Sequence, residues 1–491
     1  MPAAEPARAP REIPPILAAL VLAALIAALA AACVLACGGR LVFALDDAYI
    51  HLSLARGIAH GTYGIEPGEP AAPSSSPLWP FLLVPAVLTA QPEIVVLLLA
   101  AAAAILTAGL FQALARRAFP AARAPAAIAL AVCLSVSANL PALVMTGMEH
   151  TLQALLAVAA IWALVRFETE GTLPSWTVPA LVLGPLVRYE SLALTMPIAV
   201  LLFLRGRKRA AVAIALGALV PLALFSVFLK SRGLGWLPSS VEAKLFEQSV
   251  ALTGWGAVRH WVRVRLAAEA LPRLALIVLV LALPRSRREG GLVAAAGIAC
   301  VVLHVAFGNL GWFGRYEAYA LAAGLAAVVF SARGLLAAAA KGPALALVTV
   351  AFGWVAWPYL VIASRAPAAC QGMLGQPVQT ARFVRDYWKR PVGVNDLGYV
   401  SWAGGERVVD LWGLGSREAL LIRLRHQGFA RLDALCRNHG VRLAAVYGSF
   451  FPHPPPSWRE VGRTTLTIPN WSLASPVVTF FALDEEAARE A

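Results

Sequence analysis

The sequence predicts a mainly α-helical, polytopic membrane protein that carries a small α/β domain at its C-terminal end. Of its 491 residues, 59% are hydrophobic and only 14% are charged, a balance typical of membrane proteins. Long apolar runs recur as far as residue 362, with short basic clusters between them. From about residue 365 the pattern changes to short strands and helices separated by Gly and Pro.

The first predicted element is a transmembrane helix over residues 16–37, and the Pro/Ala-rich residues 1–15 before it are expected to form a disordered cytoplasmic tail. The run carries no charge, and it is long enough to cross about 30 Å of hydrocarbon. No small-residue cleavage site follows a short apolar core. We therefore expect a retained helix and not a removed signal peptide.

The net charge of +14 is better explained by membrane topology than by nucleic-acid binding. Basic residues cluster at 116–123, 205–209, 285–288 and 333–341, and placing all four clusters in the cytoplasm follows the positive-inside rule. This predicts further helices over 93–115, 125–145, 151–166, 174–188, 190–204, 210–229, 267–284, 291–308, 316–332 and 343–362. The total is about eleven spans. The polar segments 38–92, 146–150, 230–266 and 309–315 would then face the extracytoplasmic side, as would the C-terminal domain.

Residues 77–90 test this topology, because a full span there would invert every later helix. The segment is short for a crossing and contains three prolines, so we expect a juxtamembrane or re-entrant element.

Asp46 and Asp47 follow the first helix and open a predicted amphipathic helix over 47–60, which we expect to lie flat at the membrane surface. Unpaired carboxylates cost several kcal/mol in hydrocarbon, so acids at a membrane edge usually act in chemistry or ion binding. The alternative is that the two acids only cap the helix that follows. The Gly/Pro/Ser-rich loop 61–77 is a candidate substrate loop.

Four later segments on the same predicted side also carry charged residues. They contain Glu149 with His150, Arg188 with Glu190, Lys244, and Arg315 with Tyr316. Glu149 fits a solvated turn as well as it fits a functional acid, and lone lysines in loops, such as Lys244, are usually solvated. Arg188 and Glu190 interrupt an apolar run, where they are expensive unless they pair or bind a phosphate.

The C-terminal domain is expected to span residues 365–491, after a transmembrane domain over 16–364. Helices are predicted over 377–390 and 416–438, and strands over 391–396, 406–413, 442–448, 457–463 and 475–483. The domain has no Gly-rich phosphate fingerprint, so nucleotide binding is not predicted.

Several short motifs, in their order along the chain, resemble bacterial glycosyltransferases of the GT-C superfamily, and in particular the terminal arabinofuranosyltransferase-like group. They are the acidic pair, ARGIAHGTYGIEPGE, SSSPLWPFLL, TGMEHTLQALL, LVRYESL, LPSSVEAK, GRYE, VNDLGYVSW and RVVDLWGLGS. Tyr189 stands where the family has Pro, and Ser239 and Ser240 stand where it has Asn and Thr. These departures affect which sugar the resemblance implies, and they leave the resemblance to the superfamily intact.

The resemblance implies a bacterial inner-membrane protein whose active site and C-terminal domain face the periplasm. It also implies transfer of a sugar, such as arabinofuranose, from a polyprenyl-phosphate donor to an acceptor hydroxyl on the periplasmic side. The acceptor would be a glycan, a lipid or a protein. An acceptor hydroxyl needs a carboxylate to take its proton as an oxocarbenium-like state develops. Asp46 or Asp47 would supply it, and Asp46, at the loop–helix junction, is our first choice, with Asp47 as its partner.

The leaving phosphate needs cations in a partly dry cavity. Arg315, Lys244 and Arg188 are the candidates, in that order. The remaining candidate substrate-binding residues are Tyr316, Glu190, Glu149 and His51. Metal dependence differs within the superfamily and stays open here: Asp46, Asp47 and His51 could together hold Ca²⁺ or Mg²⁺.

Two alternatives remain open on the sequence. One is a hexosyl or aminoarabinosyl transferase that acts on lipid A, O-antigen or protein. The other, of a different class, is a membrane transporter or flippase in which the acids couple protons or cations.

Overall fold

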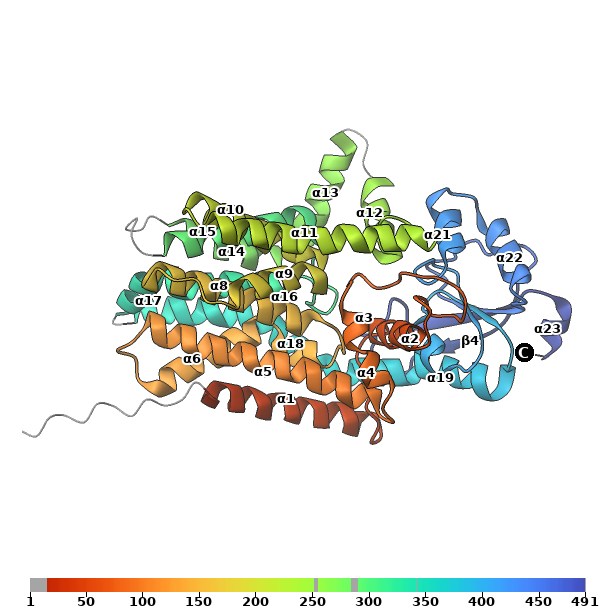
Figure 1. Ribbon diagram of the computed structural model, residues 1–491. Helices are drawn as coiled ribbons and strands as arrows, with labels where there is room; N and C mark the ends of the chain where they lie inside the picture. The colour runs from red at the N-terminus through yellow and green to blue at the C-terminus, as the bar shows by residue number, and fades with distance from the viewer. Residues whose placement is uncertain (1–15, 251–254, 284–289, 341, 491) are drawn as a thin grey trace, which may run out of the picture.

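The computed structural model describes residues 16–250, 255–283, 290–340 and 342–490, so the predicted tail 1–15 and the basic cluster 285–288 lie outside it. Figure 1 shows a bundle of helices at one end of the molecule and a small sheet domain at the other. The α5–α6 and α10–α11 connections and helix α17 lie at the end of the bundle away from the sheet domain (Figure 1). Three predicted basic clusters therefore share one end of the bundle.

Five helical segments of the described chain are long and apolar enough to cross a membrane. They are α1 (Ile16–Ala36), α5 (Pro92–Ala118), α8 (His150–Glu170), α11 (Lys208–Ser231) and the continuous segment Ala344–Trp388, which begins with α18 (Ala344–Gly375). A sixth span results if α16 (Ala318–Ser331) and α17 (Arg333–Ala339), bent by 72° at their junction, count as one. The protein is thus multi-pass.

The other predicted spans coincide with shorter apolar helices of 10–17 residues. These are α6 (Ala124–Ser137), α9 (Thr177–Val187), the pair of η1 (Tyr189–Ser191) and α10 (Leu192–Leu204), α14 (Leu271–Ala282) and α15 (Gly291–Phe307). The predicted helix 125–145 is broken, because Asn139 adopts a left-handed conformation with φ of 61° before α7 (Leu140–Val144). A count of about eleven spans stays a prediction.

Small apolar side chains form the core of the bundle. Every residue of α16 is buried, and its Ala and Gly residues allow α8 and α15 to pack closely against it. Helices α12 (Ser239–Val250) and α13 (Trp255–Ala267) project from the bundle in Figure 1.

Helix α2 (Asp47–Ala59) confirms the helix predicted after the acidic pair, but not its exposed, amphipathic character. Eight consecutive residues from Ala48 to Ala55 are buried. The reason is α20 (Gly398–Ala403) of the sheet domain, which packs on α2. Arg56 fastens this contact by donating hydrogen bonds to the carbonyl oxygens of Ser401 and Trp402, at 2.7 and 2.9 Å.

The proline-rich segment 77–90 forms two single-turn helices, α3 (Trp79–Leu82) and α4 (Val84–Val87), beside α2. Its prolines at the first turns prevent one continuous helix. The segment does not cross the bundle, as the sequence predicts.

The C-terminal domain contains a five-stranded sheet of order β2-β1-β3-β5-β4, which confirms the five predicted strands. The strands are β1 (Val392–Val394), β2 (Val408–Asp410), β3 (Leu443–Val446), β4 (Arg459–Thr465) and β5 (Val477–Ala482). β1 pairs in parallel with β2 and β3, whereas β5 is antiparallel to β3 and β4. The predicted helices appear as α19 (Pro377–Arg382), η2 (Phe383–Trp388), α21 (Arg417–Leu424) and α22 (Phe429–Asn438), and α23 (Glu485–Glu490) follows β5.

Candidate active site

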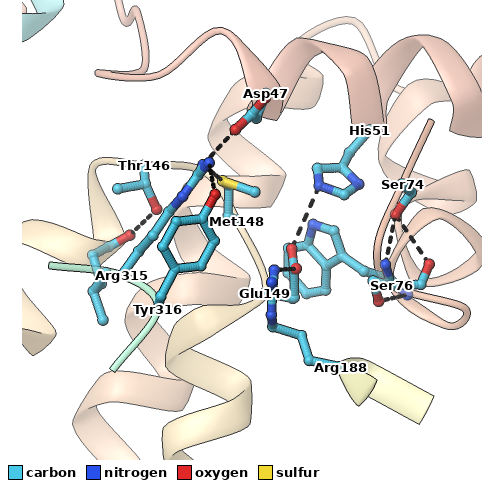
Figure 2. A network of polar contacts seen from close by, with 12 residues as sticks. Asp47, His51, Ser74, Ser76, Thr146, Met148, Glu149, Arg188, Arg315 and Tyr316 are labelled. Atoms are coloured by element: carbon cyan, nitrogen blue, oxygen red, sulfur yellow. Dashed lines mark hydrogen bonds and ion pairs between the residues drawn. The ribbon is translucent and has the colours of Figure 1, made fainter. Parts of the chain in front are cut away.

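A cavity of about 410 Å³ lies where the helical bundle meets the sheet domain. Most of the candidate residues from the sequence line it: Asp46, Asp47, His51, Arg188, Lys244, Arg315 and Tyr316. Glu149 and Glu190 do not line it, and instead each forms an ion pair with Arg188. Candidate residues from four separate parts of the chain thereby line one cavity, and Figure 2 shows Asp47, His51, Arg188, Arg315 and Tyr316 among them.

Asp47 forms an ion pair with Arg315 across this cavity, with 2.5 Å between Oδ2 and Nη1 (Figure 2). Arg315 is buried, whereas about a third of the Asp47 side chain is exposed to the cavity. Burial opposes ionisation of Asp47, but Arg315 and Lys244 outweigh it and hold the pKa of Asp47 below its ordinary value. Asp47 is therefore a carboxylate at neutral pH.

Three cationic side chains of the site lie around the ring of Tyr316. The charged ends of Lys244, Arg315 and Arg188 lie 5.0, 4.9 and 5.8 Å from the ring centroid. Arg315 also donates hydrogen bonds to the Tyr316 hydroxyl, at 3.0 Å, and to Sδ of Met148, at 2.9 Å. Three positively charged side chains are thus held close together around the Tyr316 ring.

Arg188 is fully buried, and two glutamates compensate its charge. Glu149 accepts a hydrogen bond from Nη1 at 2.6 Å, and Glu190 accepts a bidentate pair from Nη2 and Nε at 2.7 and 3.2 Å. Glu149 also faces His51, with 3.5 Å between Oε2 of the glutamate and Nε2 of the histidine. This network explains why charged residues interrupt the apolar run before α10, and it holds Arg188 rigidly at the cavity wall.

Asp46 does cap a helix, but in the other domain. Its carboxylate accepts hydrogen bonds from the backbone amides of Gly398 and Tyr399, at 2.6 and 2.8 Å, at the start of α20. It makes no cap bond to its own helix, α2. Burial and the neighbouring Asp396, with which it shares a hydrogen bond, raise the pKa of Asp46 well above its ordinary value.

Asp396 is the main acid at the cavity that the sequence did not single out. It follows β1, binds Asp46, and accepts a hydrogen bond from the Tyr447 hydroxyl at 2.7 Å. Burial raises its pKa also. The signal lay in the motif VNDLGYVSW, whose acid comes directly after a buried strand, but only the docking of the two domains brings it to Asp46.

A second, mainly apolar cavity of about 390 Å³ adjoins the first. Residues of α10, α12 and α15 line it, and Ser75 and Lys244 line both cavities. Lys244 therefore stands at the boundary between a charged chamber and an apolar one.

The proposed divalent-cation site at Asp46, Asp47 and His51 does not fit the structure. Asp46 is bound to backbone amides, and Asp47 and His51 each have another charged partner. No group of three or more His, Cys, Asp or Glu side chains in the described part of the chain could hold a metal ion. The positive charge beside Asp47 is supplied by Arg315 and Lys244.

Comparison with known proteins identifies the fold more clearly than the activity. Residues 369–481 match a family described as a domain of unknown function, DUF8728. No curated protein sequence matches the chain.

Among solved structures, the chain is similar to an oligosaccharyltransferase from Archaeoglobus fulgidus. For the crystal structure in complex with Zn and sulfate, the TM-score is 0.52 at 12% identity, over 87% of this chain and 67% of that chain. For the apo form, the TM-score is 0.46 at 12% identity, over 89% and 70%. The first likeness shows a shared fold. Membership of the GT-C superfamily, and of its arabinofuranosyltransferase-like group, stays a prediction.

Proposed function

We propose that the protein is an integral-membrane glycosyltransferase that moves a sugar from a polyprenyl-phosphate donor to an acceptor hydroxyl at the periplasmic face. One observation carries the proposal. The ionised carboxylate of Asp47 lies beside the cations Arg315 and Lys244 in a cavity that adjoins an apolar one. Such a transfer needs a proton acceptor, a phosphate-binding pair of cations and a place for a lipid chain, and this arrangement provides all three.

Asp47 is the better candidate for the base, in place of our first choice from the sequence. Both oxygens of Asp46 already accept hydrogen bonds from α20, and the side chain shares a further hydrogen bond with Asp396, so less of its accepting capacity is left for a substrate hydroxyl. Asp47 keeps part of its carboxylate open to the cavity. In the reaction, the acceptor oxygen forms a bond to the anomeric carbon and its proton passes to Asp47. The bond from that carbon to the phosphate oxygen breaks, and its electrons leave with the phosphate.

Donor binding would also strengthen this base. Without substrate, Arg315 and Lys244 hold the pKa of Asp47 low, which makes it a weak proton acceptor. A donor phosphate would compete for the same two cations, because it is the other anion that fits them. Asp47 would then lose part of its stabilisation and become more basic once the donor is in place.

The apolar cavity would take the first isoprene units of the donor lipid. Leu192, Leu303 and Phe307 line it, and Lys244 stands where it meets the charged cavity. A phosphate at Lys244 would therefore direct its sugar toward Asp47 and its lipid away from it.

Arabinofuranose is the proposed sugar because of the resemblance of the sequence motifs alone. A hexose or an aminoarabinose donor would use the same base and the same cations. A comparison of envelope glycans and surface proteins by mass spectrometry, with and without the gene, would identify the lost sugar and its acceptor.

The direct test uses the purified protein in liposomes with polyprenyl phosphates that carry arabinofuranose or a hexose. Release of polyprenyl phosphate and transfer to envelope glycan acceptors are measured. Asp47→Asn should lower the rate by about 10²–10⁴-fold, the usual contribution of a general base. The matched control is Asp386→Asn, an exposed aspartate of the sheet domain outside the cavity. Equal turnover by the Asp47 variant and wild type would refute the role of Asp47, and no turnover of any donor would refute the transferase.

A further inference from the structure

The loop before Arg315 has an unusual backbone. Gly311, Trp312, Phe313 and Gly314 have φ values of 85°, 50°, 65° and 63°, so four consecutive residues are left-handed. This conformation costs a non-glycine residue roughly 1–2 kcal/mol, and large side chains rarely adopt it. Trp312 and Phe313 therefore store strain beside the candidate active site.

Neighbouring groups hold the strained turn in place. The side-chain amide of Asn139 donates hydrogen bonds to the carbonyl oxygens of Phe313 and Gly314, at 2.9 and 3.2 Å. Glu317 accepts a hydrogen bond from the amide of Gly311 at 2.8 Å. The turn is thus fixed from the bundle side on both of its ends.

The two aromatic residues of the turn, Trp312 and Phe313, differ in how far their side chains are buried. Phe313 packs against a hydrophobic cluster that includes Phe43 and Met145, so burial compensates its backbone strain. Trp312 is 50% exposed and lines the charged cavity. Packing within the protein therefore does not account for a Trp at this position, and strain that folding does not explain points to function.

We propose that Trp312 is a specificity-determining residue that stacks against the ring of the donor sugar. The inference rests on the proposed function and adds the residue that would recognise the sugar. Sugar rings present an apolar C–H face, and Trp offers a large, rigid surface at a low cost in conformational entropy. Arg315, three residues further along the same turn, would hold the phosphate, so one clamped loop would contact both parts of the donor.

The test separates the sugar from the lipid phosphate by binding measurements on the full-length protein. The probes are undecaprenyl phosphate alone and the same lipid phosphate carrying arabinofuranose or a hexose. Wild type should bind at least one sugar-bearing lipid about three- to tenfold more tightly than the bare lipid phosphate, the range expected for an aromatic stacking contact.

Trp312→Gly should remove that advantage and leave the affinity for the bare lipid phosphate unchanged. Its melting temperature should equal or exceed that of wild type, because Gly adopts positive φ without strain. The control is Trp236→Gly, at an exposed tryptophan outside the cavity, which should keep the advantage.

The remaining outcomes separate the stacking role of Trp312 from the proposed function. An undiminished sugar advantage in Trp312→Gly, a loss of bare-lipid binding in it, or no sugar advantage in wild type would each overturn the stacking role alone. Failure of wild type to bind any of the lipids would overturn the proposed function as well.

Discussion

Replacing Asp46 by Ala should loosen the sheet domain from the bundle. The carboxylate is 93% buried, and both of its oxygens accept hydrogen bonds from amides at the start of α20. Ala would leave the amides of Gly398 and Tyr399 without acceptors, in a region where water has little access. The contact between α2 and α20 would then open more often.

The size of the effect follows from these two bonds. Each buried amide left without a partner costs about 1–3 kcal/mol, so the pair costs about 2–6 kcal/mol. Removing Asp46 also relieves its unfavourable pairing with Asp396, which offsets part of this cost. A net loss of about 2 kcal/mol or more at neutral pH corresponds to roughly thirtyfold more frequent opening of α20.

Hydrogen–deuterium exchange at the amides of Gly398 and Tyr399 measures this opening directly. Asp46→Ala should exchange there about thirtyfold faster than wild type, while peptides from α8 and α16 stay unchanged. Asp386→Ala is the matched control, because Asp386 is an exposed aspartate of the same domain whose ion-pair partner is the adjacent Arg385. An exchange rate within threefold of wild type would refute the capping role of Asp46.

Three further predictions follow from the same contacts. Gly314→Ala should lower both the melting temperature and sugar transfer, because its Cβ would lie 2.9 Å from Nδ2 of Asn139 at a φ of 63°; wild-type values for both would contradict the proposed clamp. Arg188→Met should destabilise the protein by about 3–5 kcal/mol in thermal unfolding, because it leaves Glu149 buried and uncompensated, and adding Glu149→Gln should recover part of the loss. The stability that Asp46 contributes should be largest below its unfolded pKa of about 3.8 and should fall as pH rises through its raised folded pKa, so the difference in stability between wild type and Asp46→Ala should shrink from acid to neutral pH.

Local patterns predicted much of the fold. The apolar runs place nearly every helix within a few residues, because a membrane helix satisfies its own backbone hydrogen bonds and needs only length and hydrophobicity. The five strands of the C-terminal domain were equally readable from their short runs and from the Gly and Pro turns that flank them. The break at Asn139 was not, since a left-handed residue inside an apolar run has no local signature strong enough to find it.

The sequence predicted which residues belong to the candidate site, but not which of them contact one another. Charged residues within otherwise apolar segments are easy to identify as candidates, because desolvation destabilises a buried charge that has no partner. Their partners come from other segments, and no spacing along the chain shows that Asp47 meets Arg315 or that Glu149 meets Arg188. The hypothesis of a cation site at the acidic pair stays a prediction, which the separate partners of Asp46 and Asp47 do not favour.

The sequence by itself determined that this is a multi-pass helical protein with a C-terminal sheet domain, and it singled out a small set of charged residues near the helix ends as the candidate site. Only the tertiary structure decided the roles of the two adjacent acids. Asp46 turns toward the sheet domain and Asp47 toward Arg315, because successive residues at the start of a helix point about 100° apart. Identical side chains one position apart thus reach different partners, and only the packing of the two domains determines which partner each one meets.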